Sequence, residues 1–147
     1  MAIIDSLKAN PLFGEFEPTT LELLAANFEV LSFQQGQVIT KEGDPADSFF
    51  VIEEGRVRVS KRTDVLELGP GAHFGEIGML LEAPRTATVT AVTDCRILAL
   101  SVAALDTALV AAPYAAAMFL RALAISLAER LRATTDDLSI LKTKQPR

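Results

Sequence analysis

The chain contains very few of the residues from which metal sites and catalytic triads are built. Its 147 residues include one cysteine, one histidine and no tryptophan. Cys95 therefore has no partner for an internal disulfide, and zinc or iron–sulfur sites made of cysteines are excluded. A Ser-His-Asp or Cys-His triad would need His73 as its base, which argues against that chemistry. We expect a protein that is not an enzyme and holds no metal.

Long hydrophobic runs are also missing. The most apolar run covers residues 108–120 and is interrupted by Pro113, so it is shorter than the roughly 20 residues that a membrane span requires. The N-terminus has Asp5 inside its apolar stretch and no small-residue cleavage site, which argues against a signal peptide. These features predict a soluble, cytoplasmic protein with a reduced cysteine and no membrane partner.

Charge is unevenly distributed between the two ends of the chain. Residues 1–120 carry 8 basic and 16 acidic side chains, whereas residues 121–147 carry 6 basic and 3 acidic ones. A basic tail can contact nucleic acid, but the whole chain has a net charge of −5 and duplex DNA repels acidic proteins. We interpret the basic excess as the solvated face of a helix and expect no direct DNA binding.

Local patterns predict helices at both ends of the chain and strands between them. In the N-terminal helical part, at about residues 10–29, Thr19 and Glu22 form a possible capping box. Alternating residues then predict strands at 30–33, 37–40, 48–53, 56–61, 65–68, 85–91 and 95–100. Phe49 and Phe50 are adjacent, so both are buried only if a helix covers the outer face of their strand. Short strands separated by turns indicate an antiparallel sandwich or barrel.

The C-terminal part, residues 102–142, again has a helical pattern. Ser101 is a plausible N-cap for a helix over 102–110, and Pro113 suits the first turn of a longer helix that runs to about residue 141. Its heptad positions are Leu120, Ala124, Leu127, Leu131, Thr134, Leu138 and Leu141. Such a seam predicts a parallel homodimer, and the alternative is a helix that packs on its own barrel.

The fold predicted from these elements is a single α+β domain over residues 1–147. An antiparallel, jelly-roll-like β-barrel at residues 30–101 lies between N-terminal helices and a long C-terminal dimerisation helix.

One segment, residues 74–89, breaks the strand rhythm. Gly75 and Gly78 allow close backbone approach, and a short helix over 76–81 would present free N–H groups to an anion. Arg85 follows the rigid Pro84, and a guanidinium pairs bidentately with phosphate. The carboxylate of Glu76 can accept hydrogen bonds from ribose hydroxyls. Together these residues predict a site for a ribose phosphate.

Residues 74–89 resemble the phosphate-binding cassette of the cyclic-nucleotide-binding domain family, in which FGE is followed by a loop and then by R-[ATS]-A-x-V. Residues 42–57 resemble the same family's glycine-marked strand pair, and the likeness extends from about residue 10 to 142. The chain is similar to the sensor domain of catabolite-activator-type proteins. Six residues follow Leu141, too few for a helix-turn-helix, so we expect no transcription-factor activity unless the chain is a fragment.

The resemblance implies a role for each matched position of the cassette. It assigns the ribose 2′-OH to Glu76, the lining of the ribose phosphate to Gly75, Ile77 and Gly78, the cyclic phosphate to Arg85, a phosphate oxygen or the base to Thr86, and a backbone N–H contact to Ala87. The alternative for Glu76 and Arg85 is a salt bridge between the two in an empty pocket. We expect His73 to be a surface residue or one that lies behind the ligand contacts.

The closing helix resembles the helix that faces adenine in catabolite-activator-type proteins. By that match, Thr134 and Thr135 would meet the base, one in its own subunit and one across a dimer; the alternative is that a seam threonine tunes register. A hydroxyl both donates and accepts, so Thr86 does not distinguish adenine from guanine, and Thr134 and Thr135 favour cAMP over cGMP.

The function implied is a stand-alone cyclic-nucleotide sensor that rearranges its helices on binding and signals to a partner protein. Two alternatives are a ligand-independent scaffold that keeps the barrel, and a metal-dependent jelly-roll enzyme, for which one histidine supplies too few ligands.

Overall fold

The computed structural model of this protein describes the backbone of residues 2–144 and the side chains of residues 3–134. Three short helical elements begin the chain: α1 (Ala2–Lys8), the 3-10 helix η1 (Pro11–Phe13) and α2 (Pro18–Ala25). The predicted capping box is wrong, because the N-cap is Glu17, two residues before Thr19, and it makes no side-chain hydrogen bond; Pro18 lies in the first turn of α2. Proline has a fixed φ that suits a first helical turn, so it sets the start of the helix and places Thr19 inside it.

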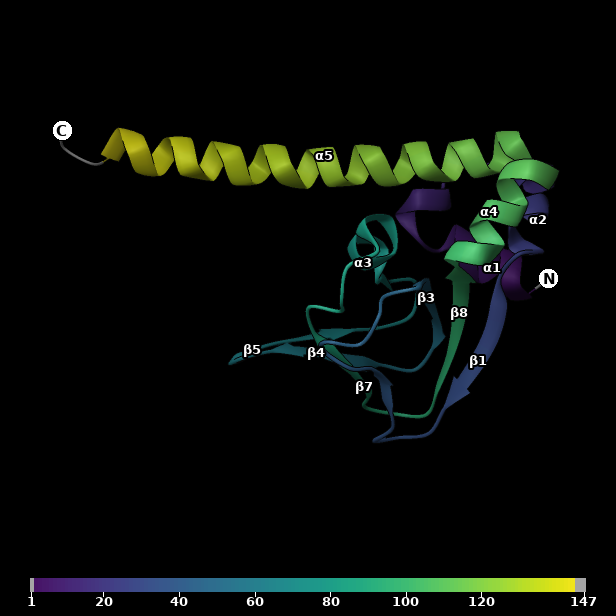
Figure 1. The fold of residues 1–147 in the computed structure, drawn as a ribbon, viewed down its shortest axis with the longest axis horizontal. Coiled ribbons are helices and arrows are strands. Elements are labelled where there is room, and N and C mark those ends of the chain that lie inside the picture. The colour runs from purple at the N-terminus through teal and green to yellow at the C-terminus, as the bar shows by residue number, and fades with distance from the viewer. Residues whose placement is uncertain (1, 145–147) are drawn as a thin grey trace.

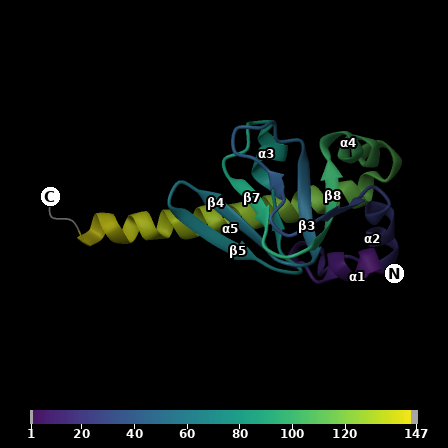
Figure 2. The ribbon, with the colours of Figure 1, turned by 90° about the horizontal axis from the view of Figure 1, so that it is seen from below.

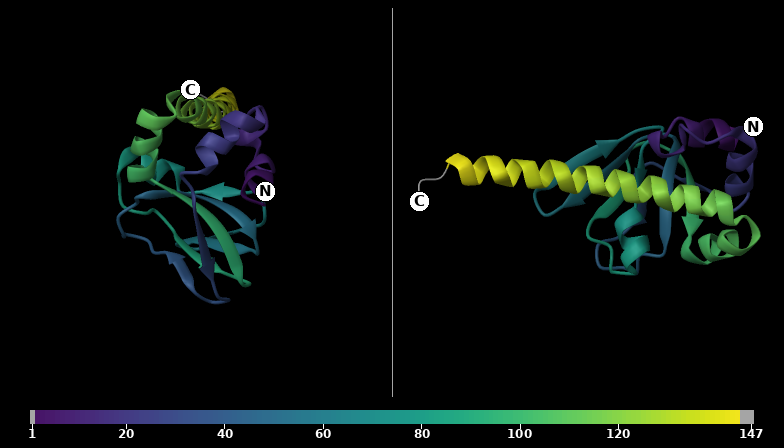
Figure 3. Two further views of the ribbon diagram at one scale, coloured as in Figure 1. Left: turned by 90° about the vertical axis from the view of Figure 1, so that its right-hand side faces the viewer. Right: turned by 90° about the horizontal axis from the view of Figure 1, so that it is seen from above.

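Eight strands follow in an antiparallel arrangement: β1 (Glu29–Phe33), β2 (Val38–Thr40), β3 (Ser48–Glu54), β4 (Val57–Lys61), β5 (Asp64–Leu68), β6 (His73–Phe74), β7 (Thr88–Ala91) and β8 (Cys95–Ser101). They form two four-stranded sheets, in the orders β1-β8-β3-β6 and β2-β7-β4-β5. The sheets face one another beneath a layer of helices (Figure 1; Figure 3, left). This arrangement confirms the predicted α+β fold with an antiparallel, barrel-like core.

Two details of the strand prediction differ from the structure. The expected strand at 85–91 begins only at Thr88, so Arg85 lies in the loop before β7, next to an isolated bridge between Pro45 and Pro84. Strand β6 was not predicted, because two residues are too few to show an alternation. It exists because Phe74 pairs with Phe50 of β3, which is a long-range contact.

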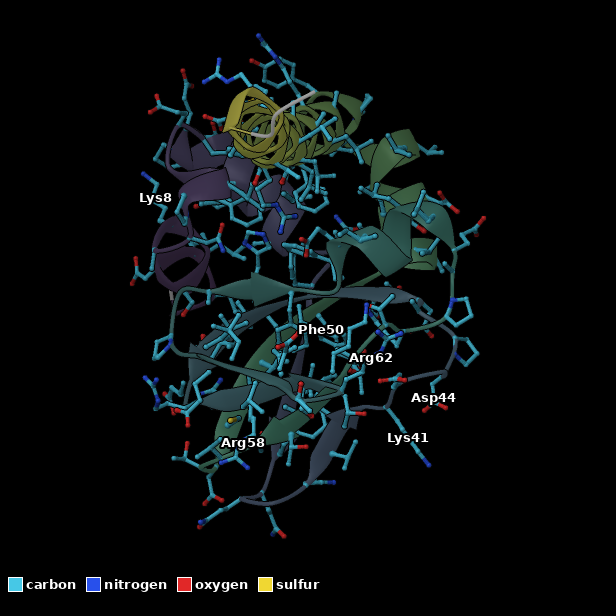
Figure 4. The ribbon with its side chains drawn as sticks, turned by 90° about the vertical axis from the view of Figure 1, so that its left-hand side faces the viewer. Lys8, Lys41, Asp44, Phe50, Arg58 and Arg62 are labelled. Carbon is cyan, nitrogen blue, oxygen red and sulfur yellow. The ribbon has the colours of Figure 1, made fainter. Side chains whose placement is uncertain are left out.

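The core has two parts, and adjacent residues of β3 divide between them. Phe49 is fully buried among the helices, in a cluster that includes Phe13 and Phe119. Phe50 points to the other side, into the space between the sheets, where its ring stacks on Phe74 at a centroid distance of 4.9 Å. The helices therefore cover the outer face of β3, and both phenylalanines are buried. Figure 4 places Phe50 in the interior, between the layers.

Two helices close the fold: α4 (Val102–Ala111) and α5 (Pro113–Lys144). The predicted cap of α4 is confirmed, since the Ser101 hydroxyl accepts a hydrogen bond from the Ala104 N–H at 3.0 Å. Helix α5 runs over the N-terminal helices and past α3 (Glu76–Leu81), and its C-terminal part extends beyond the strands (Figures 1 and 2). Among the described residues, no helix has both the length and the apolar character that crossing a membrane requires.

The first half of α5 packs on its own domain. Its buried face consists of Ala115, Ala116, Phe119 and Leu123. This face differs from the predicted heptad seam, of which Ala124 and Thr134 are exposed and Leu120 and Leu127 are half-buried. The side chains of Leu138 and Leu141 lie outside the described residues. The alternative prediction, a helix docked on its own barrel, therefore describes the first half of α5, and the dimer stays a prediction.

Candidate functional site

The segment between β6 and β7 packs so tightly that two of its positions require glycine. Gly75 has a φ of +90°, in the left-handed region, and a Cβ atom there would lie 2.8 Å from Nη1 of Arg85 and 2.9 Å from the carbonyl oxygen of Ser48. A Cβ atom on Gly78 would lie 2.4 Å from that of Ala46. The glycines therefore let α3, which begins at Glu76, lie directly against the start of β3.

Arg85 is held in this segment by backbone carbonyls. Its side chain donates from Nη2 to the Ser48 oxygen at 2.9 Å and from Nη1 to the Gly75 oxygen at 3.4 Å. Its guanidinium carbon lies 5.3 Å from the centre of the Phe50 ring. The sequence predicted that a strand carries Arg85, but the residue lies in loop 82–87. There its backbone N–H donates to the Asp44 oxygen at 2.8 Å and its carbonyl oxygen accepts from the Gly43 N–H at 2.9 Å. The position of Arg85 depends on these backbone bonds and on the side-chain contacts.

The positive charge of Arg85 is buried and has no ion-pair partner among the described side chains. The residue is 8% exposed, and none of the ion pairs formed by the described side chains includes it. Burial lowers the pKa of the Arg85 guanidinium from its ordinary value, and the more distant charge of Asp47 partly opposes this. Lys41, in contrast, lies at the periphery and points outward (Figure 4). An unpaired buried cation is costly, so this position suits an anionic ligand.

Glu76 is the second buried charge of the site, and its partner comes from the far end of the chain. It is 7% exposed, and its Oε1 lies 2.6 Å from Nη2 of Arg130 on α5. The alternative of a Glu76–Arg85 salt bridge is therefore wrong. Oε2 of Glu76 makes no hydrogen bond within residues 3–134, which leaves this oxygen as an acceptor for a hydroxyl.

Arg130 was not predicted as a site residue, although a signal for it exists in the sequence. It lies seven positions after Leu123, on the helix face that Phe119 and Leu123 bury. A charged residue that continues an apolar helix face points toward the neighbouring layer and can meet a partner of opposite charge there. Which carboxylate serves as that partner depends on how α5 crosses α3.

His73 and Asn10 form a second pair that the sequence did not reveal. Asn10, before η1, is fully buried, and its amide nitrogen lies 2.8 Å from Nδ1 of His73. His73 is half-buried, so the expectation of a residue behind the ligand contacts describes it better than a surface position. Burial lowers the pKa of His73 below 6.5; Glu76 raises it in part, and Arg130 lowers it further.

These residues surround a cavity of about 600 Å³, within the size range of small-ligand sites. Glu76, Arg85, Thr86 and Arg130 supply polar groups. The apolar lining includes Val59, Leu66, Leu68 and Val89 from strands of one sheet, Phe74 from the other sheet, and Ile77 and Leu81 from α3. In the part of the chain that the structure describes, no group of His, Cys, Asp and Glu side chains is arranged to hold a metal. The cavity thus combines a polar end that can hold an anion with apolar walls.

The predicted site residues fall into two groups. Seven of them line the cavity: Gly75, Glu76, Ile77, Gly78, Arg85, Thr86 and Ala87. Thr134 does not line the cavity of the single chain; it is exposed, and its hydroxyl donates to the Arg130 carbonyl oxygen at 3.0 Å. The side chain of Thr135 lies outside the described residues.

Comparison with known proteins agrees with this geometry. Acetyltransferase Pat of Mycolicibacterium smegmatis is 44% identical over 90 residues, which cover 58% of this chain and 27% of Pat. The cAMP-dependent protein kinase regulatory subunit of Dictyostelium discoideum is 44% identical over 83 residues, 49% of this chain and 25% of the subunit. The chain thus spans about a quarter of the length of either relative.

Solved structures and family models lead to the same assignment. The crystal structure of Thermus thermophilus catabolite activator protein matches with a TM-score of 0.78 at 30% identity, and the match covers 90% of this chain and 63% of that one. The family model of the cyclic nucleotide-binding domain matches residues 30–111, more than half of the chain. The chain therefore belongs to the cyclic nucleotide-binding domain family.

Proposed function

We propose that this protein is a regulatory module that binds a cyclic nucleotide, cAMP in preference to cGMP, in the cavity beside α3. The observation that carries the proposal is the guanidinium of Arg85, which is buried at the cavity without a carboxylate partner among the described side chains. A phosphate would supply the missing charge, and a guanidinium suits its geometry. The family relationship supports the same ligand class.

In this proposal each polar group of the cavity has one role. Arg85 binds the cyclic phosphate, with Thr86 and the Ala87 N–H beside it, and Oε2 of Glu76 accepts the ribose 2′-OH. Gly75, Ile77 and Gly78 line the ribose phosphate through their backbone. The apolar strand residues then face the base. A base is an aromatic ring with polar edges, which suits a cavity with apolar walls and few polar groups.

The preference for cAMP rests on the end of α5. We propose that Thr134 and Thr135 meet the adenine, at least one of them across a dimer, since Thr134 does not reach the cavity of its own chain. The relative from Dictyostelium is cAMP-dependent by its name, which supports adenine over guanine. Competition of cGMP against bound cAMP tests the preference, and equal affinities would contradict it.

The ion pair between Glu76 and Arg130 supports a route by which the ligand signals. It joins α3 of the binding site to α5 over 54 residues of sequence. A hydroxyl bound to Glu76 changes the field that Arg130 experiences, so the ligand favours one arrangement of α5 over another. A partner protein would bind to the rearranged surface of α5.

A second copy of the chain is the other partner that we propose. The heptad seam of α5 supports it, and so does the length of α5 that extends past the strands (Figure 1). Sedimentation equilibrium tests this: we expect a dimer for the natural chain and a monomer for Leu131→Asp, whose site is 68% exposed in the single chain. A natural chain that is monomeric at high micromolar concentration would contradict it.

Isothermal titration calorimetry with cAMP tests the proposed function directly. We expect saturable binding with one nucleotide per chain. The alternative is a ligand-independent scaffold that keeps the barrel. It predicts no heat of binding and no change in melting temperature with cAMP, cGMP or cyclic dinucleotides. That result, obtained with folded protein, would replace the sensor by the scaffold.

A further inference from the structure

The side chain of Asn10 determines which nitrogen of His73 carries the proton. Its Oδ1 accepts a hydrogen bond from the Leu12 N–H at 2.9 Å, and its Nδ2 donates to the Gly71 carbonyl oxygen at 2.9 Å. These two backbone partners fix the orientation of the amide, because an N–H can only donate and a carbonyl can only accept. The amide nitrogen therefore also donates to Nδ1 of His73, at 2.8 Å.

The consequence is a neutral imidazole with its proton on Nε2. If Nδ1 accepts, the remaining proton of the neutral ring lies on the other nitrogen. Burial lowers the pKa of His73, which agrees with a neutral ring near pH 7. Within residues 3–134, no hydrogen-bond partner exists for Nε2. His73 thus presents one fixed, unused donor.

The position of the ring shows where that donor can act. His73 lines the cavity beside α3 and also a second cavity of about 710 Å³ between η1 and α5, so this residue borders both cavities. Glu76 and Arg130 are near enough for their charges to act on the ring. Oε2 of Glu76 is also unpaired among the described side chains, and Glu76, His73 and Arg130 line the same cavity. Two of the residues that line this cavity therefore have an unused polar atom, one an acceptor and the other a donor.

A hydroxyl can use both members of such a pair, because it donates one hydrogen bond and accepts another. We infer that His73 is a further recognition residue of the nucleotide site: its Nε2–H donates to the ribose 2′-OH that Glu76 accepts. The inference rests on the proposed function, since it concerns the same ligand. Asn10 is then the residue that positions the donor, and it ties the segment before η1 to nucleotide recognition.

The test compares cAMP with 2′-deoxy-cAMP on the natural chain and on two matched variants. In His73→Gln the side-chain amide can place an N–H near the position of Nε2–H, whereas the shorter amide of His73→Asn reaches only the position of Nδ1. The measured quantity is the dissociation constant of 2′-deoxy-cAMP divided by that of cAMP, determined by competition calorimetry. We expect the ratio in His73→Asn to fall about 3- to 10-fold below that of the natural chain, the value of one neutral hydrogen bond. His73→Gln should keep most of the ratio.

A purely structural role of His73 predicts the opposite order of the two variants: His73→Asn should keep the natural ratio better than His73→Gln. The reason is that asparagine can replace the contact with Asn10 and glutamine cannot. An unchanged ratio in His73→Asn, while the natural chain binds cAMP, overturns the inference and leaves the proposed function intact. A natural chain that binds no cAMP overturns both.

A second measurement needs no substitution, because His73 is the one histidine of the chain. Its two ring nitrogens give the whole histidine side-chain ¹⁵N spectrum of the natural protein. We expect an unprotonated Nδ1 and a protonated Nε2 near pH 7, with an Nε2 resonance that shifts on addition of cAMP and much less with 2′-deoxy-cAMP. A protonated Nδ1, or equal shifts with the two nucleotides, overturns the inference.

Discussion

Replacing Arg85 by alanine should nearly abolish nucleotide binding and leave the fold intact. An arginine side chain has five N–H donors, and two of those of Arg85 go to the carbonyls of Ser48 and Gly75. Three donors remain for a phosphate. A hydrogen bond to a charged group contributes about 1.5–3 kcal/mol, so two such bonds contribute about 3–6 kcal/mol. At about 1.4 kcal/mol for each factor of ten, the dissociation constant should rise roughly 10²- to 10⁴-fold.

The stability of Arg85→Ala should change little, because two effects oppose one another. The substitution leaves the carbonyls of Ser48 and Gly75 without this donor, which costs stability. It also removes a cation that is 8% exposed and has no ion-pair partner among the described side chains, which is favourable. We expect a net change within about 1–2 kcal/mol, measured by urea denaturation without nucleotide.

Calorimetry with cAMP measures the loss of affinity, and two variants serve as controls. Arg85→Lys keeps the charge without the planar donor geometry, so its affinity should lie between those of the natural chain and Arg85→Ala. Arg58→Ala removes an equal charge from an exposed position at the periphery (Figure 4) and should bind normally. A folded Arg85→Ala protein with the natural dissociation constant would refute the assignment of Arg85 to the phosphate.

Three further predictions concern the residues around Arg85. In a double-mutant cycle of Glu76→Gln and Arg130→Gln, urea denaturation should give a coupling of about 0.5–1 kcal/mol, since the Arg130 side chain is 55% exposed; zero coupling would mean that the ion pair adds nothing to stability. Gly75→Ala should lower the free energy of unfolding by at least about 1 kcal/mol and weaken cAMP binding, because its φ of +90° is strained for alanine and its Cβ meets Arg85; natural stability and affinity would contradict this. The free energy of unfolding should fall as the pH drops below 6.5, because the unfolded chain binds a proton that the lowered pKa of His73 keeps off the native state. That slope is at most about 1.4 kcal/mol per pH unit, and a His73→Gln protein with the same slope would assign it to other groups.

Local patterns in the sequence were enough to locate most elements of the fold. Alternation located every strand except β6, the N-cap signal of Ser101 was correct, and the glycine spacing located α3. These features depend on a few neighbouring residues, so a short stretch of sequence contains the information. The capping box at Thr19 failed because Pro18, a stronger local signal, begins the first turn of the helix and places Thr19 inside it.

The candidate site was predictable to the extent that one segment contains it. The cassette residues from Gly75 to Ala87 follow one another closely, and the structure places them along one cavity. Arg130 and Asn10 reach the same region from opposite ends of the chain. No local sequence motif identifies the partner of either residue, so the sequence did not predict them as site residues.

The sequence by itself determined the order of helices and strands, the glycines that α3 requires and the presence of an arginine and a glutamate suited to a ribose phosphate. The tertiary structure alone decided that Glu76 pairs with Arg130, 54 residues later in the sequence. It also decided that Asn10 contacts His73, 63 residues later, and so determines which ring nitrogen carries the proton. The reason is physical: backbone preference and side-chain periodicity act within a few residues, whereas the partner of a buried polar group depends on how the helical layer packs on the sheets.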